Sequence, residues 1–186
     1  AKHVLHNSAE NFAEVSLELG GKSPFLVFED ADIESAVNGS IAGIFGATGQ
    51  SCVAGSRLYL HEDIADAFLE RMTRLAKEIR IGDPLLEETQ MGPLCTLGQM
   101  SSVENEVALA VQEGGTILCG GKKPDGLKGN YYEPTIIECP RQNMHIVDTE
   151  MFGPVLSVLR FKTEEAAIEM ANDTVHGLAA GIFTRA

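Results

Sequence analysis

Strand-like and helix-like segments alternate along the chain, and this order restricts the fold more than any other feature. Residues 25–28 are four apolar residues in a row, which is typical of a strand buried on both faces of a parallel sheet. A helix rich in Ala, Gly and Ile follows at residues 33–45, with Asp30 or Asp32 as its N-cap. The alternation predicts an α/β fold, a three-layer sandwich in which helices cover both faces of a mostly parallel sheet.

The remaining expected elements follow from the period of the apolar residues. Pro134 favours an edge position for the strand that contains it. Asp63 begins a helix with one apolar stripe from Ile64 to Ile79, and Thr163 caps the last helix. We expect strands at residues 15–19, 57–61, 116–119, 131–138, 155–161 and 178–184, helices at 99–112 and 164–172, and the end of a helix at 1–12.

The composition excludes several classes of protein. The 186 residues include 14 basic and 27 acidic side chains, and the net charge of −13 argues against nucleic acid or an anionic membrane surface as a partner. No segment has the length of a membrane span, and the first residues lack a signal-peptide pattern. The four cysteines match neither a metal motif nor a disulfide framework. We therefore expect reduced thiols, no metal site and a cytoplasmic protein.

Cys52 is the first candidate for chemistry. It lies among small residues and glycines, whereas an inert cysteine is normally surrounded by large apolar side chains. Small neighbours let a ligand approach and leave backbone N–H groups free to bind an oxyanion. The residues alone leave two interpretations open, a thiolate nucleophile and a structural thiol. For Cys95, Cys119 and Cys139 we favour the structural interpretation.

Two acidic residues are further candidates. Glu18 is expected at the carboxyl end of the strand at residues 15–19, where a carboxylate could act as a general base. The alternative for Glu18 is a salt bridge to Lys22. Glu150 and Phe152 belong to a Gly-Pro turn before a buried strand, where they could bind a sugar diol and a flat ring. The alternative there is an ordinary turn with an exposed acid.

Three motifs taken together resemble the aldehyde dehydrogenase superfamily. They are Glu-Leu-Gly-Gly-Lys-Ser-Pro from Glu18, Gly-Gln-x-Cys-x-Ala-x-x-Arg from Gly49, and Glu-x-Phe-Gly-Pro from Glu150. Gly92-Pro93, Gln99 and residues 177–183 match as well. The motifs occur in the same order over essentially the whole chain. The resemblance implies an enzyme of the hydrolytic type, which oxidises an aldehyde to a carboxylic acid with NAD or NADP.

The resemblance also implies roles for single residues. Cys52 corresponds to the nucleophile that forms a thiohemiacetal and then a thioester, and its backbone N–H to one half of an oxyanion hole. Glu18 corresponds to the base that activates water. Four residues correspond to cofactor contacts: Glu150 at the nicotinamide ribose, Phe152 beside the nicotinamide ring, Leu19 at its amide and Gln99 nearby.

By the same comparison, residues 1–186 correspond to the catalytic domain of such an enzyme. A Rossmann-type NAD-binding domain and a C-terminal oligomerisation segment are absent, and both ends look cut. We therefore expect the chain alone to bind NAD weakly and turn over poorly. The full-length protein is expected to be a homodimer or homotetramer.

Three alternatives stay open. In a CoA-acylating relative, CoA rather than water would release the acyl group, although Glu18 argues against this. A non-catalytic derivative of the fold would keep the architecture without the chemistry, and intact Cys52 and Glu18 argue against that. A Cys–His hydrolase would need His61 or His176, and neither lies in a suggestive context. The residues define neither the aldehyde nor the choice between NAD and NADP.

Overall fold

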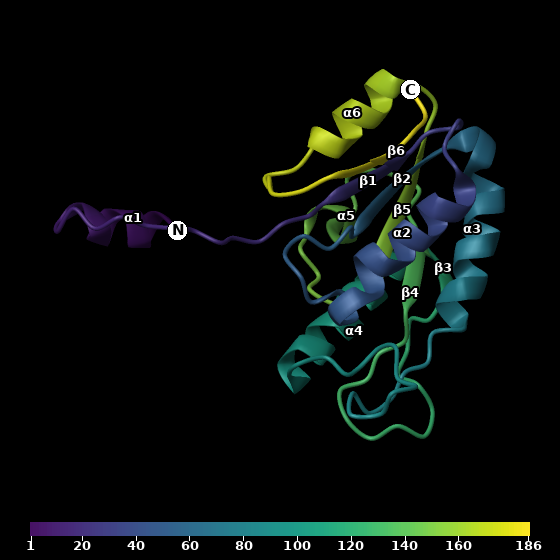
Figure 1. Cartoon of the computed structure of the whole chain (residues 1–186), viewed down its shortest axis with the longest axis horizontal. Helices are drawn as coiled ribbons and strands as arrows, with labels where there is room; N and C mark the ends of the chain where they lie inside the picture. The colour runs from purple at the N-terminus through teal and green to yellow at the C-terminus, as the bar shows by residue number, and fades with distance from the viewer.

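The computed structural model describes all residues 1–186, which form a six-stranded sheet with helices on both faces (Figure 1). The strand order is β3-β4-β5-β2-β1-β6, and only the pairing of β3 with β4 is antiparallel. The strands are β1 (Pro24–Val27), β2 (Arg57–His61), β3 (Thr116–Cys119), β4 (Thr135–Glu138), β5 (Val155–Phe161) and β6 (Gly181–Phe183). The helices are α1 (Lys2–Ala9), α2 (Ile33–Phe45), α3 (Glu62–Lys77), α4 (Leu97–Gln112), α5 (His145–Asp148) and α6 (Glu164–Asn172), with a 3-10 turn η1 (Gly46–Gly49). The predicted α/β fold is confirmed.

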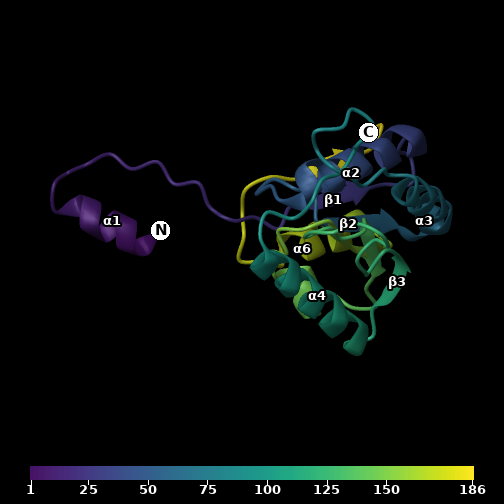
Figure 2. The same ribbon diagram turned by 90° about the horizontal axis from the view of Figure 1, so that it is seen from below.

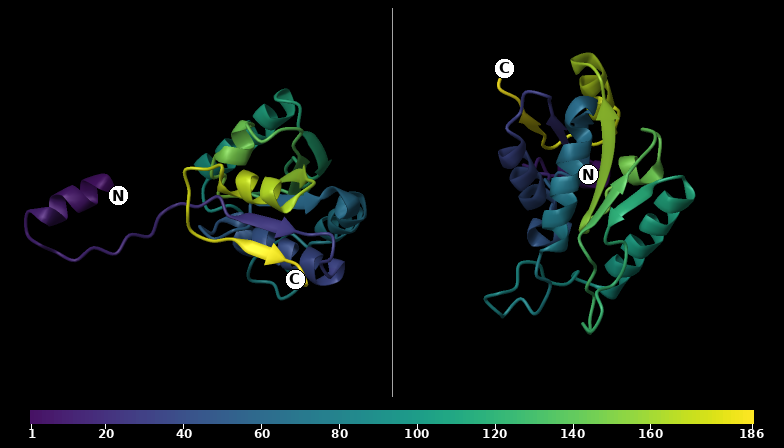
Figure 3. Two further views of the ribbon diagram at one scale, coloured as in Figure 1. Left: turned by 90° about the horizontal axis from the view of Figure 1, so that it is seen from above. Right: turned by 90° about the vertical axis from the view of Figure 1, so that its right-hand side faces the viewer.

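Two apolar clusters, one on each face of the sheet, build the three layers (Figure 3). Helices α2 and α3 cover the face that receives Leu58 and Leu60. Helices α4, α5 and α6 cover the face that receives Leu26 and Tyr59. Successive side chains of a strand point to opposite faces, so a strand covered on both sides must be apolar at every position. This explains the continuous apolar run that begins at Phe25.

Helix α2 spans the predicted residues because its first turn is capped. Asp32 Oδ1 accepts a hydrogen bond from the backbone N–H of Ser35 at 2.8 Å, so Asp32 rather than Asp30 is the N-cap. Helix α3 begins one residue earlier than expected, and His61 provides its cap. It ends at Lys77, and Ile79 therefore packs against the core from beyond the helix.

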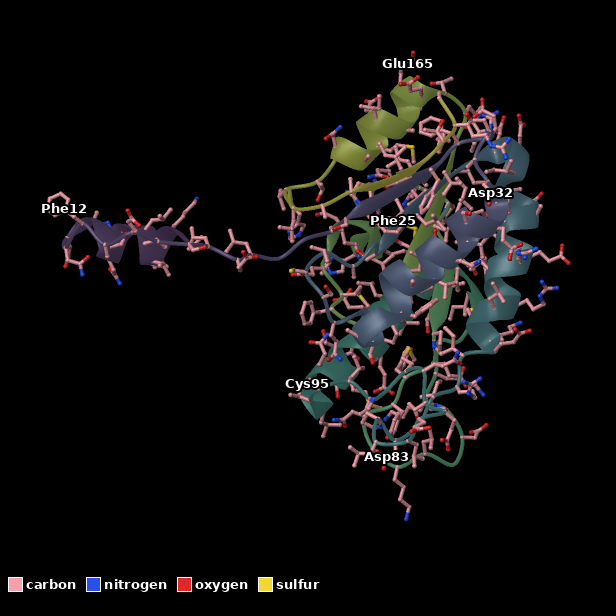
Figure 4. All side chains as sticks on the ribbon, in the orientation of Figure 1. Phe12, Phe25, Asp32, Asp83, Cys95 and Glu165 are labelled. Atoms are coloured by element: carbon pink, nitrogen blue, oxygen red, sulfur yellow. The ribbon has the colours of Figure 1, made fainter.

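Residues 15–19 do not form the predicted strand. Their alternating pattern is present, but a strand also needs a neighbour, and this segment has none. Figures 1 and 2 show α1 and the following residues projecting from the body as an arm (residues 1–19). No residue of α1 is buried, and Phe12 is 93% exposed on the arm (Figure 4).

Two strands are shorter than predicted, and one prediction of position is wrong. Strand β4 begins at Thr135, so Pro134 lies outside the ladder and its missing N–H has no effect on strand pairing. This lets β4 occupy an interior position between β3 and β5 instead of the expected edge. Strand β6 keeps only three residues. Helix α5, four residues long, is too short to give a periodic signal and was not predicted.

Candidate active site

The predicted site residues gather at the amino end of the parallel sheet. Strands β5, β2 and β1 are parallel neighbours, so the residues that precede them meet at one edge. This places Glu18 and Leu19 before β1, Cys52 before β2, and Glu150 and Phe152 before β5. The expectation that Glu18 lies at the carboxyl end of a strand is wrong, because the strand predicted ahead of β1 does not form. We call residues 46–56 the Cys52 loop and residues 150–154 the Glu150 turn.

Gly20 and Gly21 form the point where these segments meet. The backbone N–H of Gly21 donates a hydrogen bond to Oε1 of Glu150 at 3.0 Å. A side chain at Gly20 would collide with the Glu150 carboxylate, and one at Gly21 would collide with the backbone carbonyl of Cys52. The missing Cβ atoms therefore allow the segment before β1 to lie directly against the Cys52 loop and the Glu150 turn.

The Cys52 loop has a strained backbone just before the cysteine. Ala47, Thr48 and Gly49 have positive φ angles of 49°, 58° and 68°. A β-branched residue such as Thr48 rarely adopts this conformation, which persists only where the surroundings fix it. Cys52 follows in a turn, half-buried, with a free thiol. The loop thus presents a thiol at the amino edge of the sheet.

The segment ahead of α4 fixes the Cys52 loop from outside. Thr48 Oγ1 donates a hydrogen bond to the carbonyl of Gly92 at 3.2 Å. The backbone N–H of Cys95 donates to Oε1 of Gln50 at 2.9 Å. Figure 4 shows Cys95 beside the first turn of α4, where it is exposed. These two bonds explain how the strained residues before Cys52 keep their conformation.

The Glu150 turn is held by Gln99. Its Nε2 atom donates hydrogen bonds to the carbonyls of Met151, at 2.7 Å, and of Phe152, at 2.9 Å. Phe152 has a positive φ of 49°, and its side chain is 41% exposed. The structure thus uses the side-chain amide of Gln99 to shape the turn that presents Glu150 and Phe152.

Glu18 and Leu19 lie on the last part of the arm, and both are exposed. Glu18 forms no salt bridge, and the alternative pairing with Lys22 is wrong because the Lys22 ammonium is buried without a partner. Glu18 is therefore not used to stabilise the body of the protein.

Arg57 and Lys22 are buried at the same edge. From the sequence, Lys22 was considered only as a salt-bridge partner of Glu18, and Arg57 was assigned no role. Arg57 donates from Nε to the carbonyl of Lys22 at 2.7 Å and from Nη2 to the carbonyl of Ala171 at 2.8 Å. Burial, followed by the charge of Arg57, lowers the pKa of Lys22 from 10.5 to about 7. The sequence gives one sign of this burial: the residues directly beside Lys22 and Arg57 are small or apolar.

The prominent hollows of the surface lie elsewhere. One of about 650 Å³, lined by Phe28, His61 and Thr184 among others, is at the carboxyl ends of β1, β2 and β6, opposite to Cys52. No group of three or more His, Cys, Asp or Glu side chains is arranged to hold a metal ion. None of the helices combines the length and the apolar character that a membrane span requires.

A sequence model of the aldehyde dehydrogenase family matches residues 1–186. The chain belongs to this family. Among curated relatives, a (Z)-2-((N-methylformamido)methylene)-5-hydroxybutyrolactone dehydrogenase of Acinetobacter baylyi is 53% identical, and the match covers 99% of this chain and 38% of that protein. The chloroplastic betaine aldehyde dehydrogenase of Atriplex hortensis is 47% identical over 98% of this chain and 36% of its own length. The resemblance seen in the three motifs is confirmed.

Solved aldehyde dehydrogenases share the fold. The NAD⁺ complex of the Bacillus cereus aldehyde dehydrogenase has a TM-score of 0.93 and 39% identity, and the match covers all of this chain and 38% of that one. The Staphylococcus aureus betaine aldehyde dehydrogenase, also an NAD⁺ complex, has a TM-score of 0.93 and 40% identity over 99% of this chain and 37% of that one. This chain therefore spans little more than a third of the length of these relatives.

Proposed function

We propose that this chain is the nucleophile-bearing domain of a hydrolytic aldehyde dehydrogenase, which oxidises an aldehyde to a carboxylic acid with NAD or NADP. The observation that supports it best is the meeting point at Gly20 and Gly21. There the segment that carries Glu18 lies against both the Cys52 loop and the Glu150 turn. Glu18, Cys52 and Glu150 precede neighbouring parallel strands at one edge of the sheet, which supports their proposed use as base, nucleophile and cofactor ligand.

The residues around the Glu150 turn fit a nicotinamide nucleoside. One oxygen of Glu150 is held by Gly21, and the carboxylate can accept hydrogen bonds from the two hydroxyls of a ribose. The exposed ring of Phe152 can pack on the nicotinamide, and the backbone of the exposed Leu19 can contact the nicotinamide amide. Gln99 keeps this turn in place through its two backbone carbonyls. When bound, NAD(P)⁺ accepts the hydride that leaves the aldehyde carbon.

Cys52 supplies the covalent step. Its thiolate attacks the aldehyde carbon to give a thiohemiacetal, whose oxyanion the Cys52 backbone N–H stabilises. Loss of hydride leaves a thioester on Cys52. Glu18 then takes a proton from water, the resulting hydroxide attacks the thioester carbon, and the carboxylic acid leaves while the Cys52 thiolate is restored.

The rest of the machinery is proposed to lie outside residues 1–186. The relatives are more than twice as long as this chain, and the resemblance assigns their further length to a Rossmann-type NAD-binding domain and an oligomerisation segment. We propose a homodimer or homotetramer for the full-length protein, in the cytoplasm. Light scattering on the purified enzyme measures the oligomeric state.

The test is a kinetic comparison of full-length variants with a panel of aldehydes that includes betaine aldehyde. Cys52→Ala should abolish NAD reduction, because no thioester can form. Glu18→Gln should keep the first turnover but slow steady-state turnover by about 100-fold, because proton transfer to a placed base contributes on that order. Rapid-mixing absorbance at the NADH band separates the two phases. An unchanged steady-state rate for Glu18→Gln, or a product that forms only with CoA, would contradict the hydrolytic mechanism.

A further inference from the structure

A small hollow beside the start of β1 is lined by buried polar side chains. Its volume is about 140 Å³, and its lining includes Lys22, Ser23, Arg57 and much of the segment 171–180, which leads from α6 toward β6. Lys22 and Ser23 are each 2% exposed, and Arg57 is fully buried. The polar groups of this hollow are therefore shielded from solvent, and a shielded polar group needs a partner.

Two of these polar groups have no partner within the protein. The ammonium Nζ of Lys22 and the hydroxyl Oγ of Ser23 are both buried without a hydrogen bond. They belong to successive residues that line the same hollow. An ammonium can only donate hydrogen bonds, and a hydroxyl can donate one as well. A ligand that satisfies both groups must therefore be an acceptor.

The hollow also brings two cationic residues together without an acid. Arg57 donates from Nε and Nη2 to the carbonyls of Lys22 and Ala171, at 2.7 Å and 2.8 Å, and these acceptors are neutral. No Asp or Glu lines the hollow. Asp148 and Glu150 favour the charged form of Lys22 through space, but neither accepts a hydrogen bond from its Nζ. Water in the hollow would leave two like charges uncompensated in a medium of low dielectric constant, whereas an anion compensates them.

We propose that this hollow is a binding site for a small monovalent anion such as chloride. The Lys22 ammonium and the Ser23 hydroxyl donate to the anion, and the charge of Arg57 adds to the attraction. Phosphate fits less well, because its several oxygens need more donors than these two free groups supply. The site takes part in no step of the proposed reaction.

The anion site borders the candidate active site. Leu178 lines the hollow, and its Cδ2 atom lies 3.3 Å from the position that a Cβ at Gly21 would occupy. Gly21 is the residue whose N–H binds Glu150, and the next carbonyl, that of Lys22, is held by Arg57. A bound anion therefore stabilises the folded position of the segment on which the Cys52 loop and the Glu150 turn meet.

The first test locates the anion in crystals of the full-length enzyme. The crystals are soaked in sodium bromide at pH 6, below the Lys22 pKa of about 7, because bromide replaces chloride and is seen by its anomalous scattering. We expect an anomalous peak within hydrogen-bonding distance of Nζ of Lys22 and Oγ of Ser23. The peak should be absent in Lys22→Met. A wild-type crystal without this peak, or an equal peak in Lys22→Met, would overturn the proposal.

The second test measures anion binding in solution by thermal unfolding of the full-length enzyme at pH 6. Sodium chloride is compared with sodium gluconate, whose anion is too large for the hollow, each at 100 mM. A chloride dissociation constant of about 10 mM would raise the ratio of folded to unfolded protein about tenfold and the melting temperature by about 2 °C. The rise should be lost in Lys22→Met and reduced in Ser23→Ala. Lys122→Met, which changes an exposed lysine, should keep it.

Ser23→Ala keeps the proposal open to refutation if Lys22→Met does not fold, because it removes only one hydroxyl. A wild-type rise in melting temperature in both Ser23→Ala and Lys22→Met would show that chloride acts elsewhere, and so would a full rise in Ser23→Ala when it is the one variant that folds. A bromide peak in the crystal without any chloride-dependent rise in solution would mean an adventitious ion only. Each of these results would contradict the anion site and leave the proposed function untouched.

Discussion

At the scale of single residues, the arrangement of the candidate site depends on two glycines that have no Cβ atom. Gly20 and Gly21 bring Glu150 and Cys52 together only because neither has a Cβ atom. Within the motif it is the two glycines that this packing requires, and Gly21 most strongly, because its neighbour is a backbone carbonyl. Glu18, by contrast, is exposed, and its side chain forms neither a hydrogen bond nor a salt bridge within residues 1–186.

The lowered pKa of the buried Lys22 predicts a cost in stability, which Lys22→Met should remove. Between about pH 7 and 10.5 the unfolded chain carries the Lys22 proton and the folded chain does not, so wild-type stability rises with pH in this window. Below pH 7 both states are protonated, and the folded state has the full cost of a buried charge. At pH 6, the free energy of unfolding of Lys22→Met should therefore exceed that of wild type by on the order of a few kcal/mol. Urea denaturation measures this difference. This advantage should shrink steadily toward pH 10. An advantage that does not change with pH would mean that Lys22 is not buried with a lowered pKa.

At the scale of elements, one edge of the sheet assembles the site, and α4 braces it from outside. The first turn of α4 carries Gln99, which holds the Glu150 turn, and the segment before it binds the Cys52 loop. Thr96 caps this helix by accepting a hydrogen bond from the backbone N–H of Gln99 at 3.1 Å. The stability of one helix end is therefore linked to the geometry of the Glu150 turn.

Thr96→Ala tests this link. Loss of the cap should lower the free energy of unfolding by about 1 kcal/mol, measured by urea denaturation, and should also weaken NAD binding in the full-length enzyme because Gln99 becomes less ordered. Thr163→Ala is the matched control, since Thr163 caps α6 in the same way but away from the Glu150 turn. Its stability should fall by a similar amount with NAD affinity unchanged. Equal effects of both variants on NAD affinity would show that α4 does not position the turn.

Sequence patterns predicted the elements whose signals are local. The cap and apolar face of residues 33–45 lie within the helix, so α2 was placed correctly. Pairing is not local: residues 15–19 have the pattern of a strand but no neighbour, and Pro134 limits β4 only if it lies inside the ladder. The motif residues could be found from the sequence, whereas the Gly21–Glu150 bond joins residues far apart in the chain and needs the fold. The same holds for the burial of Lys22.

At the scale of the whole molecule, the chain forms one layered body with an arm that contributes nothing to either apolar cluster. Glu18 and Leu19 lie where this arm joins the body, so two of the predicted site residues have neighbours on one side only. The site is an open edge rather than an enclosed cleft. Enclosure excludes water and strengthens the electrostatic interactions on which catalysis depends.

Residues 1–186 alone should therefore bind NAD more than about tenfold more weakly than the full-length enzyme, a loss of at least 1.4 kcal/mol of binding free energy. The adenosine and pyrophosphate parts of the cofactor find no glycine-rich turn in this sequence. Calorimetric titration gives both affinities, and circular dichroism shows whether the isolated chain is folded. NADH formation should stay near the level of a Cys52→Ala control of the same chain. If the isolated chain oxidises an aldehyde at the full-length rate, the open edge is sufficient for catalysis and the proposed division of labour is wrong.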